Sequence, residues 1–267
     1  MIRRVDHVVI LVNDLAAASN DYTNLGFNVI PGGEHADGAT HNALVAFADG
    51  SYLELIAFKQ PAEQHRWWRY TSVGEGFVDF ALLPESIESD MAEAQSRGLP
   101  LAGPAAGGRA RPDGQQIQWQ LGTPTTTDLP FLCADVTDRS LRVPAGEAVI
   151  HANGANGMAA LTVVVGDLEA SVTRYRALLG LEPATMPSPD ASVPRTVSFI
   201  LDDTRLILAQ PSPEDIDQNM LAYLNQHGEG PYALALYSAN VGGGPGKLNT
   251  ALTHGAWLEL VAETAVA

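Results

Sequence analysis

Cysteine is almost absent from the sequence: the chain of 267 residues contains only Cys133. No disulfide can form within the chain, and no cluster of thiolates can hold a metal ion. Cys133 stands in the apolar run 129–134, where we expect a buried, unreactive thiol and not a nucleophile. We therefore expect the functional side chains to be of other residue types.

Basic residues are also scarce. The chain has 15 Lys and Arg against 31 Asp and Glu, which gives a formal charge of −16 at pH 7. A field of this sign repels phosphate backbones and anionic lipid headgroups, and it also favours solubility. We therefore expect a small-molecule ligand as the partner, and neither nucleic acid nor a membrane.

Long apolar runs are missing as well. No stretch reaches the ~18 apolar residues of a membrane-spanning helix. Arg3 and Arg4 stand near the start without a long apolar region behind them, so we expect no signal peptide. With 46% hydrophobic and 17% charged residues, the composition is typical of a compact globular protein, and we expect it in the cytoplasm.

The first 58 residues show the order β-α-β-β-β. Asn13 and Asp14 provide an N-terminal cap for a helix over 15–24, and Gly26 ends it. Alternating and β-branched runs predict the strands, with tight turns between them. The predicted strands are 7–12, 27–30, 42–47 and 52–58, and the turns include 31–33.

The same pattern returns along the chain, which indicates an internal duplication. An offset of 153 residues takes Asp14 to Asp167 and Tyr22 to Tyr175 without a gap. A weaker copy follows at an offset of 72, and a truncated copy occupies the C-terminal residues. In these copies we expect strands at 77–83, 117–121, 129–133, 232–238 and 257–261, helices at 85–97, 213–227 and 247–254, and a long loop at 103–114.

Several motifs carry a resemblance to a known family. The phrase 6–15, DHVVILVNDL, and the repeated βαβββ pattern resemble the vicinal oxygen chelate (glyoxalase/bleomycin resistance/dioxygenase) superfamily. The chain is similar to its glyoxalase-like subgroup over residues 1–135, and later residues carry only the fold pattern. The subgroup's pattern is matched at 32–35, 40–44, 52–55, 111–114 and Trp119.

The resemblance implies an α+β fold of tandem βαβββ modules, paired into two half-barrels. We expect a glyoxalase-like domain over 1–135, built from modules 1–58 and 75–135. A linker over 136–157 leads to a second, degenerate domain over 158–267. That domain contains modules 158–210 and 230–267, the last one truncated. Its incompletely closed edge makes a homodimer possible.

The resemblance also implies a metal site, because superfamily ligands come from the first and last strands of paired modules. The matching positions are His7, Glu54 and Asp79, while the fourth falls near the apolar Phe131 or Leu132. One imidazole and two carboxylates suit Zn²⁺, Mn²⁺, Ni²⁺ or Fe²⁺ and leave positions open for substrate. The family usually has histidine at the position of Asp79 and a carboxylate at the fourth, and both departures weaken the assignment.

The side chain of Glu54 alternates with those of Leu53 and Leu55, which places it on the lumen side of a barrel strand. For Glu54, the alternative is an ordinary solvent-exposed strand residue. For His7, the alternative is a half-buried histidine whose hydrogen bonds are satisfied within the protein. In the second half, the offset of 153 brings Ala160 and Ile207 to the ligand positions. We therefore expect no metal site there, and mainly a structural role.

Further candidates surround this set. His41 could transfer protons and Asn42 could orient a substrate oxygen, or both could simply bond the strand edge. Arg109 and Arg111 could clamp a ligand oxygen, with solvated loop arginines as the alternative. His35 is expected on a loop near the barrel mouth. The aromatic residues Trp67 and Trp119 are expected as pocket walls.

Three functions follow from these features. The first is a divalent-metal-dependent lyase, isomerase or dioxygenase that acts on a small oxygen-rich molecule, with Glu54 and His41 as catalytic residues. The second is a metal-free protein that binds or sequesters a small molecule, as antibiotic-binding superfamily members do. The third is a scaffold whose pockets are vestigial. Metal content separates the first from the others.

Overall fold

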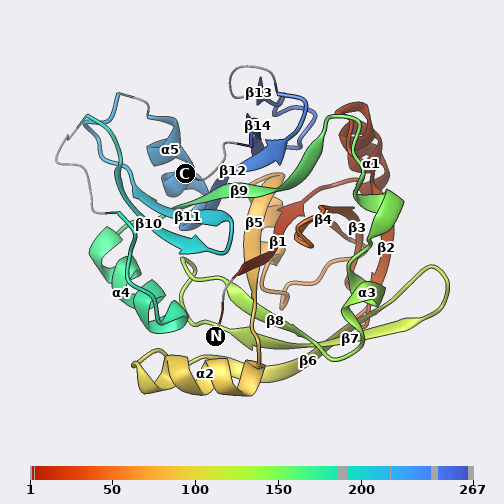
Figure 1. The fold of residues 1–267 in the computed structure, drawn as a ribbon, viewed down its shortest axis with the longest axis horizontal. Helices are drawn as coiled ribbons and strands as arrows, with labels where there is room; N and C mark the ends of the chain where they lie inside the picture. Colours follow the sequence, from red (N-terminus) through yellow and green to blue (C-terminus); the bar gives the residue numbers. More distant parts are fainter. Residues whose placement is uncertain (1, 3, 186–191, 217, 242–245, 264–267) are drawn as a thin grey trace.

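The structure is a computed structural model that describes residues 2, 4–185, 192–216, 218–241 and 246–263. Eight strands form a closed barrel in the order β1-β4-β3-β2-β6-β7-β8-β5 (Figure 1). The strands are β1 Arg4–Leu11, β2 Ile30–His35, β3 Thr40–Ala46, β4 Tyr52–Phe58, β5 Gly76–Leu83, β6 Ala102–Ala110, β7 Gln116–Thr123 and β8 Phe131–Asp135.

A second, open sheet has six strands in the order β10-β11-β9-β12-β14-β13. Its strands are β9 Ala155–Val164, β10 Arg195–Leu201, β11 Thr204–Gln210, β12 Gly230–Ser238, β13 Gly246–Lys247 and β14 Trp257–Ala262. The α-helices are α1 Leu15–Asn24, α2 Ile87–Ser96, α3 Arg139–Arg142, α4 Leu168–Leu179 and α5 Asn219–His227, and the 3₁₀ helices are Trp68–Ser72 and Gly146–Val149. The expected α+β fold of paired modules is confirmed.

The register of the strands confirms the duplication. In the barrel, β1 runs parallel to β4 with Val8 opposite Leu53. In the open sheet, β9 runs parallel to β11 with Leu161 opposite Leu206. Both residues of the second pair stand 153 positions after those of the first, so the pairing itself is repeated.

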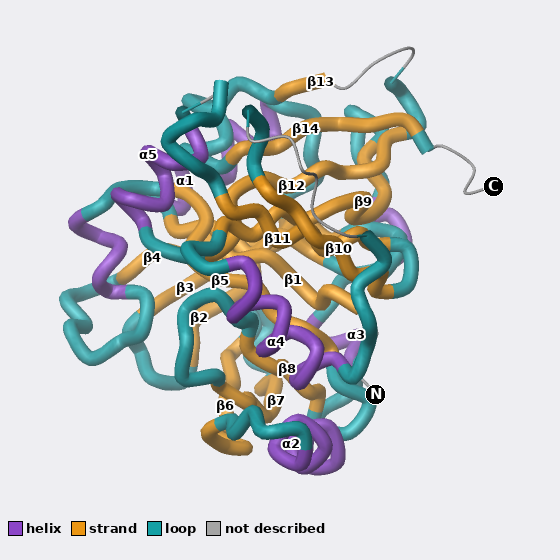
Figure 2. The backbone as a smooth tube through the Cα atoms, turned by 90° about the vertical axis from the view of Figure 1, so that its left-hand side faces the viewer, coloured by secondary structure: helices purple, strands orange, loops and turns teal. Residues whose placement is uncertain are grey.

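The two halves pack on one another (Figure 2), and buried side chains from both form one hydrophobic core. Strand β5 of the barrel contacts β12 of the open sheet, and α2 lies beside α4. Two buried tyrosines at equivalent positions cross between the halves. The hydroxyl of Tyr22 donates to the carbonyl of Thr253 at 3.1 Å, and that of Tyr175 donates to the carbonyl of Asp128 at 2.6 Å.

Four expected elements are wrong. Of the strand expected over 27–30, only Ile30 belongs to a strand, β2. The loop expected over 103–114 is largely β6, and the turn expected over 31–33 lies inside β2. In β2, glycine allows the neighbouring strand β6 to come close. A Cβ on Gly33 would lie 1.9 Å from the carbonyl oxygen of Ala110 on β6. The helix expected over 247–254 is replaced by the end of β13 and a series of turns.

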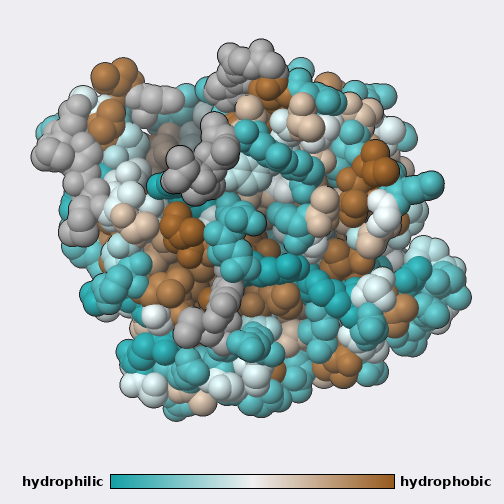
Figure 3. Space-filling view, viewed as in Figure 1, coloured by the Kyte–Doolittle hydropathy of each residue, from teal (hydrophilic) through white to brown (hydrophobic). Residues whose placement is uncertain are grey.

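The described residues include no helix that is long and apolar enough to cross a membrane. On the face drawn in Figure 3, apolar side chains lie in scattered patches among polar ones. The large hydrophobic residues that stay exposed also come from separate segments, Val136, Ile150, Val193, Ile200 and Ile216. Single exposed apolar residues of this kind are normal in globular proteins.

Candidate functional site

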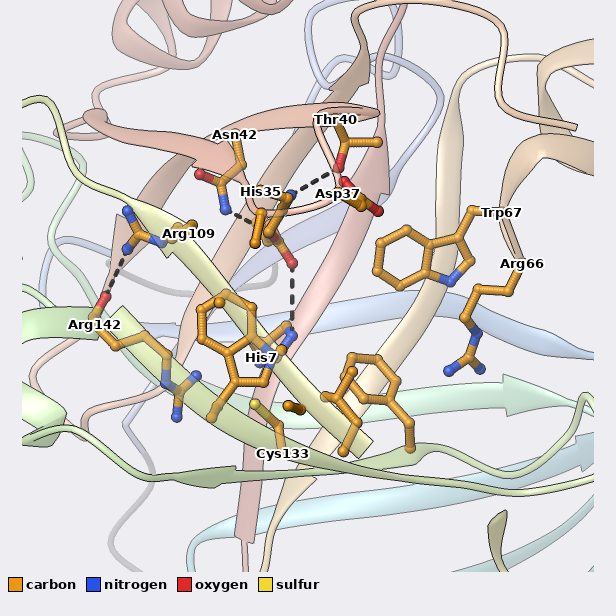
Figure 4. A pocket seen from close by; sticks show the side chains of 18 of the residues that line it. His7, His35, Asp37, Thr40, Asn42, Arg66, Trp67, Arg109, Cys133 and Arg142 are labelled. Atoms are coloured by element: carbon orange, nitrogen blue, oxygen red, sulfur yellow. Dashed lines mark hydrogen bonds and ion pairs between the residues drawn. The ribbon is translucent and has the colours of Figure 1, made fainter. Parts of the chain in front are cut away.

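A cavity of about 250 Å³ lies inside the barrel. It is lined by side chains from β1, β2, β3, β4, β6, β7 and β8, by the segment that leads from β4 to β5, and by α3 (Figure 4). In that view Trp67 and Arg66 stand on one side, and Arg109 and Arg142 on the other. The polar lining residues are His7, His35, Asp37, Thr40, Asn42, Tyr52, Glu54, His65, Arg66, Arg109, Cys133 and Arg142.

The carboxylate of Glu54 is the centre of this cavity. Its two oxygens face different imidazoles, with Oε2 3.6 Å from Nε2 of His7 and Oε1 3.5 Å from Nε2 of His35. The amide of Asn42 donates to Oε1 at 2.5 Å. Burial alone would raise the pKa of Glu54, but His35, His7 and Asn42 together hold this pKa below its usual value. The carboxylate is thus ionised at neutral pH although it is buried.

His7 is fixed from three sides. Its Nδ1 lies 2.8 Å from Oδ2 of Asp6. Its ring stacks on Tyr52, with 4.6 Å between centroids, and meets the edge of Phe131 at 5.4 Å. Only 4% of the His7 side chain is exposed. This leaves Nε2 as the nitrogen that faces the cavity.

The sequence predicted His35 on a loop. The structure instead places it at the end of β2. Its Nδ1 lies 2.7 Å from the hydroxyl of Thr40, and its ring meets the edge of Trp119. Burial lowers the pKa of His35, and the charges of Glu54 and Asp37 oppose that shift only in part. A neutral imidazole therefore faces the carboxylate of Glu54 near pH 7, with one nitrogen to donate and one to accept.

Arg109 brings a positive charge to the wall of the cavity. Its side chain belongs to β6 and is only 4% exposed. The guanidinium donates to the carbonyl oxygens of Gly32 and Arg142. Burial lowers the pKa of Arg109, while Tyr52 and Glu54 act in the opposite direction. In the described part of the chain, no carboxylate forms an ion pair with this guanidinium, so its positive charge can act on an oxygen of a ligand.

Aromatic rings form much of the remaining wall, namely Tyr52, Trp67, Trp119 and Phe131. Cys133 also lines the cavity, and burial raises the pKa of its thiol. The thiol therefore stays protonated at neutral pH, as expected for an unreactive cysteine.

The predicted metal ligands do not form a set that fits an ion. Asp79 faces the barrel interior next to Val9, but its Oδ2 accepts from the indole of Trp67 at 2.8 Å and pairs with Arg66 at 2.6 Å. The two imidazoles face different oxygens of Glu54. Among the residues that the structure describes, no three His, Cys, Asp or Glu side chains are grouped as metal ligands.

The remaining predicted site residues divide into two groups. His7, Asn42, Glu54, Trp67 and Trp119 are brought together in the cavity. His41, predicted as catalytic, lies next to Asn42 on β3 and so points to the opposite face, toward a groove beside α1. Arg111, predicted to bind substrate, lines a separate depression, where it bonds the carbonyl of Leu141 and pairs with Asp113.

Three residues of the site, Asp6, Arg142 and Thr40, were missed by sequence reasoning. Asp6 precedes His7 directly, and the pair of residue types alone could have marked an oriented imidazole. Arg142 comes from the expected linker, which carried no motif. Thr40 lies across a turn from His35, and their five-residue separation gave no sign that their side chains meet.

Comparisons with known proteins agree with this architecture. The family model described as a glyoxalase-like domain matches residues 5–179. No curated protein matches the chain. Among solved structures, a hypothetical protein from Staphylococcus aureus superposes with a TM-score of 0.73 at 14% identity, over 97% of this chain and 98% of the other.

Two further solved structures are enzymes by name. A triple mutant of 4-hydroxymandelate synthase from Streptomyces coelicolor has a TM-score of 0.62 at 13% identity, over 89% of this chain and 72% of the other. A xylose isomerase-like TIM barrel/4-hydroxyphenylpyruvate dioxygenase fusion protein has a TM-score of 0.55 at 15% identity, over 89% of this chain and 37% of the other. At such identities the likeness concerns the fold, which is the vicinal oxygen chelate fold that the motifs predicted.

Proposed function

The chain belongs to the glyoxalase-like domain family, and on that premise we propose that its barrel binds one small planar molecule and moves a proton on it, as an isomerase or lyase does. The observation that carries the proposal is the buried carboxylate of Glu54 between the imidazoles of His7 and His35. A buried, ionised carboxylate next to two imidazoles combines a proton acceptor with two rings that can take up a proton and pass it on.

The size and walls of the cavity define the ligand. Its volume of about 250 Å³ is below the ~300–1,000 Å³ of sites for drug-sized ligands. Trp67 and Trp119 offer flat apolar surfaces on which a planar group can stack. We therefore assign a compact ligand with an aromatic ring or another conjugated plane.

The position of the Arg109 guanidinium in the cavity wall indicates that the ligand carries a carbonyl or carboxylate oxygen. When Glu54 takes a proton from the carbon next to a carbonyl, the electron pair of the C–H bond moves to the carbonyl oxygen and gives an enolate. A fixed cation near that oxygen stabilises the developing negative charge. The proton held by Glu54 then returns to the oxygen or to a neighbouring carbon, either directly or after passing to Nε2 of His7, and this leaves Glu54 ionised again and completes an isomerisation.

The residues present do not fit the metal that the family implies, and no step of the proposal needs one. Asp79 is engaged by Arg66 and Trp67. The fourth family position falls near Phe131 or Leu132, neither of which can bind a metal, and Phe131 forms part of the aromatic wall. The charge of Arg109 takes the part that a Lewis acid would otherwise have.

Deuterium exchange tests this function. Phenylpyruvate, chosen because 4-hydroxyphenylpyruvate appears in the name of one structural neighbour, has an exchangeable methylene next to a ketone. We expect the protein to accelerate exchange of that methylene in D₂O, followed by proton NMR, and the variant Glu54→Gln to lose the acceleration. Glu259→Gln is the matched control, because Leu258-Glu259-Leu260 on β14 repeats the pattern of Leu53-Glu54-Leu55. Equal exchange in wild type and Glu54→Gln overturns the proposal.

The second candidate function is binding without chemistry. The aromatic walls favour it, because stacking holds a ligand without any proton transfer. Titration calorimetry and thermal shift with phenylpyruvate distinguish the two, since a bound ligand stabilises the folded state by mass action. Similar binding by wild type and Glu54→Gln, without exchange in either, supports a sequestering protein.

A further inference from the structure

A β-bulge in β1 brings two consecutive side chains to the site. In the pairing of β1 with β5, Val5 lies opposite Leu82 and His7 lies opposite Ala81, so Asp6 has no partner of its own. In a regular strand, neighbouring side chains point to opposite faces, whereas a bulge re-aims one of them. Asp6 is fully buried, and its carboxylate lies beside the ring of His7.

The contact between Asp6 and His7 defines where the imidazole carries its hydrogen. An ionised carboxylate only accepts hydrogen bonds, so Nδ1 of His7, at 2.8 Å, must be the donor. Although burial alone would raise the pKa of Asp6, Arg142, His7 and Arg139 hold this pKa well below its usual range. The hydrogen on Nδ1 leaves Nε2 to face Glu54.

Arg142 holds two of the groups that surround His7. Its Nη1 donates to Oδ2 of Asp6 and to the hydroxyl of Tyr52, both at 2.7 Å. The ring of Tyr52 is the one that stacks on His7, at an interplanar angle of 16°. A further bond from Nη2 to Asp135 on β8, at 3.0 Å, anchors the guanidinium to the barrel. Arg142 is itself only 2% exposed.

We propose that Asp6 and Arg142 are positioning residues of this site. Asp6 keeps the proton of His7 on Nδ1, so that Nε2 is the nitrogen presented to Glu54 and to the ligand. Arg142 keeps Asp6 and Tyr52 in the places that this orientation requires. The catalytic meaning of the arrangement rests on the proposed function, but the orientation itself is measurable without a ligand.

The test uses the full chain with ¹⁵N-labelled histidine. Two-bond proton–nitrogen correlation spectra show which ring nitrogen of a histidine is protonated, and the loss of one pattern in His7→Gln assigns the signals of His7. In wild type we expect Nδ1 to be protonated. In Asp6→Asn, whose amide can donate to Nδ1, we expect the proton to move to Nε2. Asp128→Asn, another fully buried carboxylate that pairs with Arg174, is the matched control and leaves the His7 pattern unchanged.

Arg142→Gln provides the second variant in case Asp6→Asn does not fold. There we expect a mixture of both tautomers of His7, because Asp6 and Tyr52 lose their common donor. With phenylpyruvate, Asp6→Asn should lower kcat for exchange by roughly 10² or more, the contribution typical of a positioned acid–base group, with little change in KM.

The outcomes separate the two proposals. An unchanged His7 tautomer in both Asp6→Asn and Arg142→Gln overturns the positioning role, whatever the activity. A shifted tautomer together with no exchange in wild type supports the positioning role and removes the proposed function alone.

Discussion

Two buried carboxylates of the barrel should respond differently to the same substitution. Asp6 is fully buried, and it accepts from Arg142 at 2.7 Å, from Arg139 at 2.6 Å and from His7 at 2.8 Å. Asp6→Asn removes the charge that compensates two buried or half-buried guanidinium groups. Breaking a buried ion pair costs about 3–5 kcal/mol, and the amide keeps one acceptor, so we expect a loss of about 3 kcal/mol in the free energy of unfolding at pH 7.

Asp79→Asn should cost no more than about 1 kcal/mol. Burial raises the pKa of Asp79 despite the opposing effects of Arg66 and Trp67, so its charge is a burden to the folded state at neutral pH. The free energy gained when that charge is removed offsets part of the free energy lost with the hydrogen bonds. The side chain of Arg66 is 38% exposed and can be solvated by water once its partner is gone.

Equilibrium unfolding in urea, followed by circular dichroism at several pH values, measures both changes. The folded-state pKa of Asp6 is lowered, so its contribution is complete above about pH 4, the usual value of an aspartate, and is lost as the pH falls through the folded-state pKa. Asp79 has the opposite sign, because its burden is relieved as the pH falls through its raised pKa. Equal losses for the two variants at pH 7 would refute this account of the barrel charges.

Three further predictions follow from the site and the packing. Dialysis against EDTA should leave the rate of deuterium exchange into phenylpyruvate unchanged. If dialysis abolishes this rate and Zn²⁺, Mn²⁺, Ni²⁺ or Fe²⁺ restores it, the metal-free assignment is contradicted. His35→Gln should raise the pKa of Glu54, since His35 is the main group that lowers it, and so move the acid limb of the pH–rate profile to higher pH. Tyr22→Phe and Tyr175→Phe should each lower the free energy of unfolding in urea by about 0.5–1.5 kcal/mol, because each removes one buried hydrogen bond between the halves. In the double variant the two losses should add. Non-additive losses would show that the two contacts are coupled.

The sequence predicted those elements whose limits are set by local chemistry. The helix α1 begins after Asp14, whose carboxylate accepts from the backbone of Ala16 and Ala17, as its capping position predicted. The strand β4 has the predicted bounds, and Glu54 faces the lumen as its alternation with leucines required. Both signals lie within a few residues of the element that they define.

The sequence could not predict features that depend on distant neighbours. Gly32 and Gly33 are typical of a turn, but both are needed inside a strand, because a Cβ on Gly33 would meet the backbone of Ala110 on β6 and a Cβ on Gly32 would meet Asn42 on β3. The bulge at Asp6 depends on pairing with β5, about 75 residues later, and is invisible in the alternation of β1. The contacts of Asp79 with Arg66 and Trp67 could not be predicted for the same reason, because both partners belong to a segment without a regular pattern.

The duplication gave the two halves the same pairing between the first and last strands of their first modules, but different chemistry. At the positions of His7 and Glu54, the second half has Ala160 and Ile207, so an acid–base centre of this kind has no counterpart on β9 and β11. The second half instead supports the barrel. The imidazole of His254, for example, lies 3.0 Å from Glu75 and 3.2 Å from Asp21.

The segment between the halves is part of the site and not only a connection. Its helix α3 supplies Arg139 and Arg142, which reach back more than 130 residues to the carboxylate of Asp6. Because Asp6 orients His7, and His7 faces Glu54, the geometry of the cavity depends on where this short helix docks against β8. A barrel built from residues 1–135 alone would keep Glu54 and both imidazoles but lose the two guanidinium groups that hold Asp6 charged in a buried place. The functional unit therefore extends at least to Arg142.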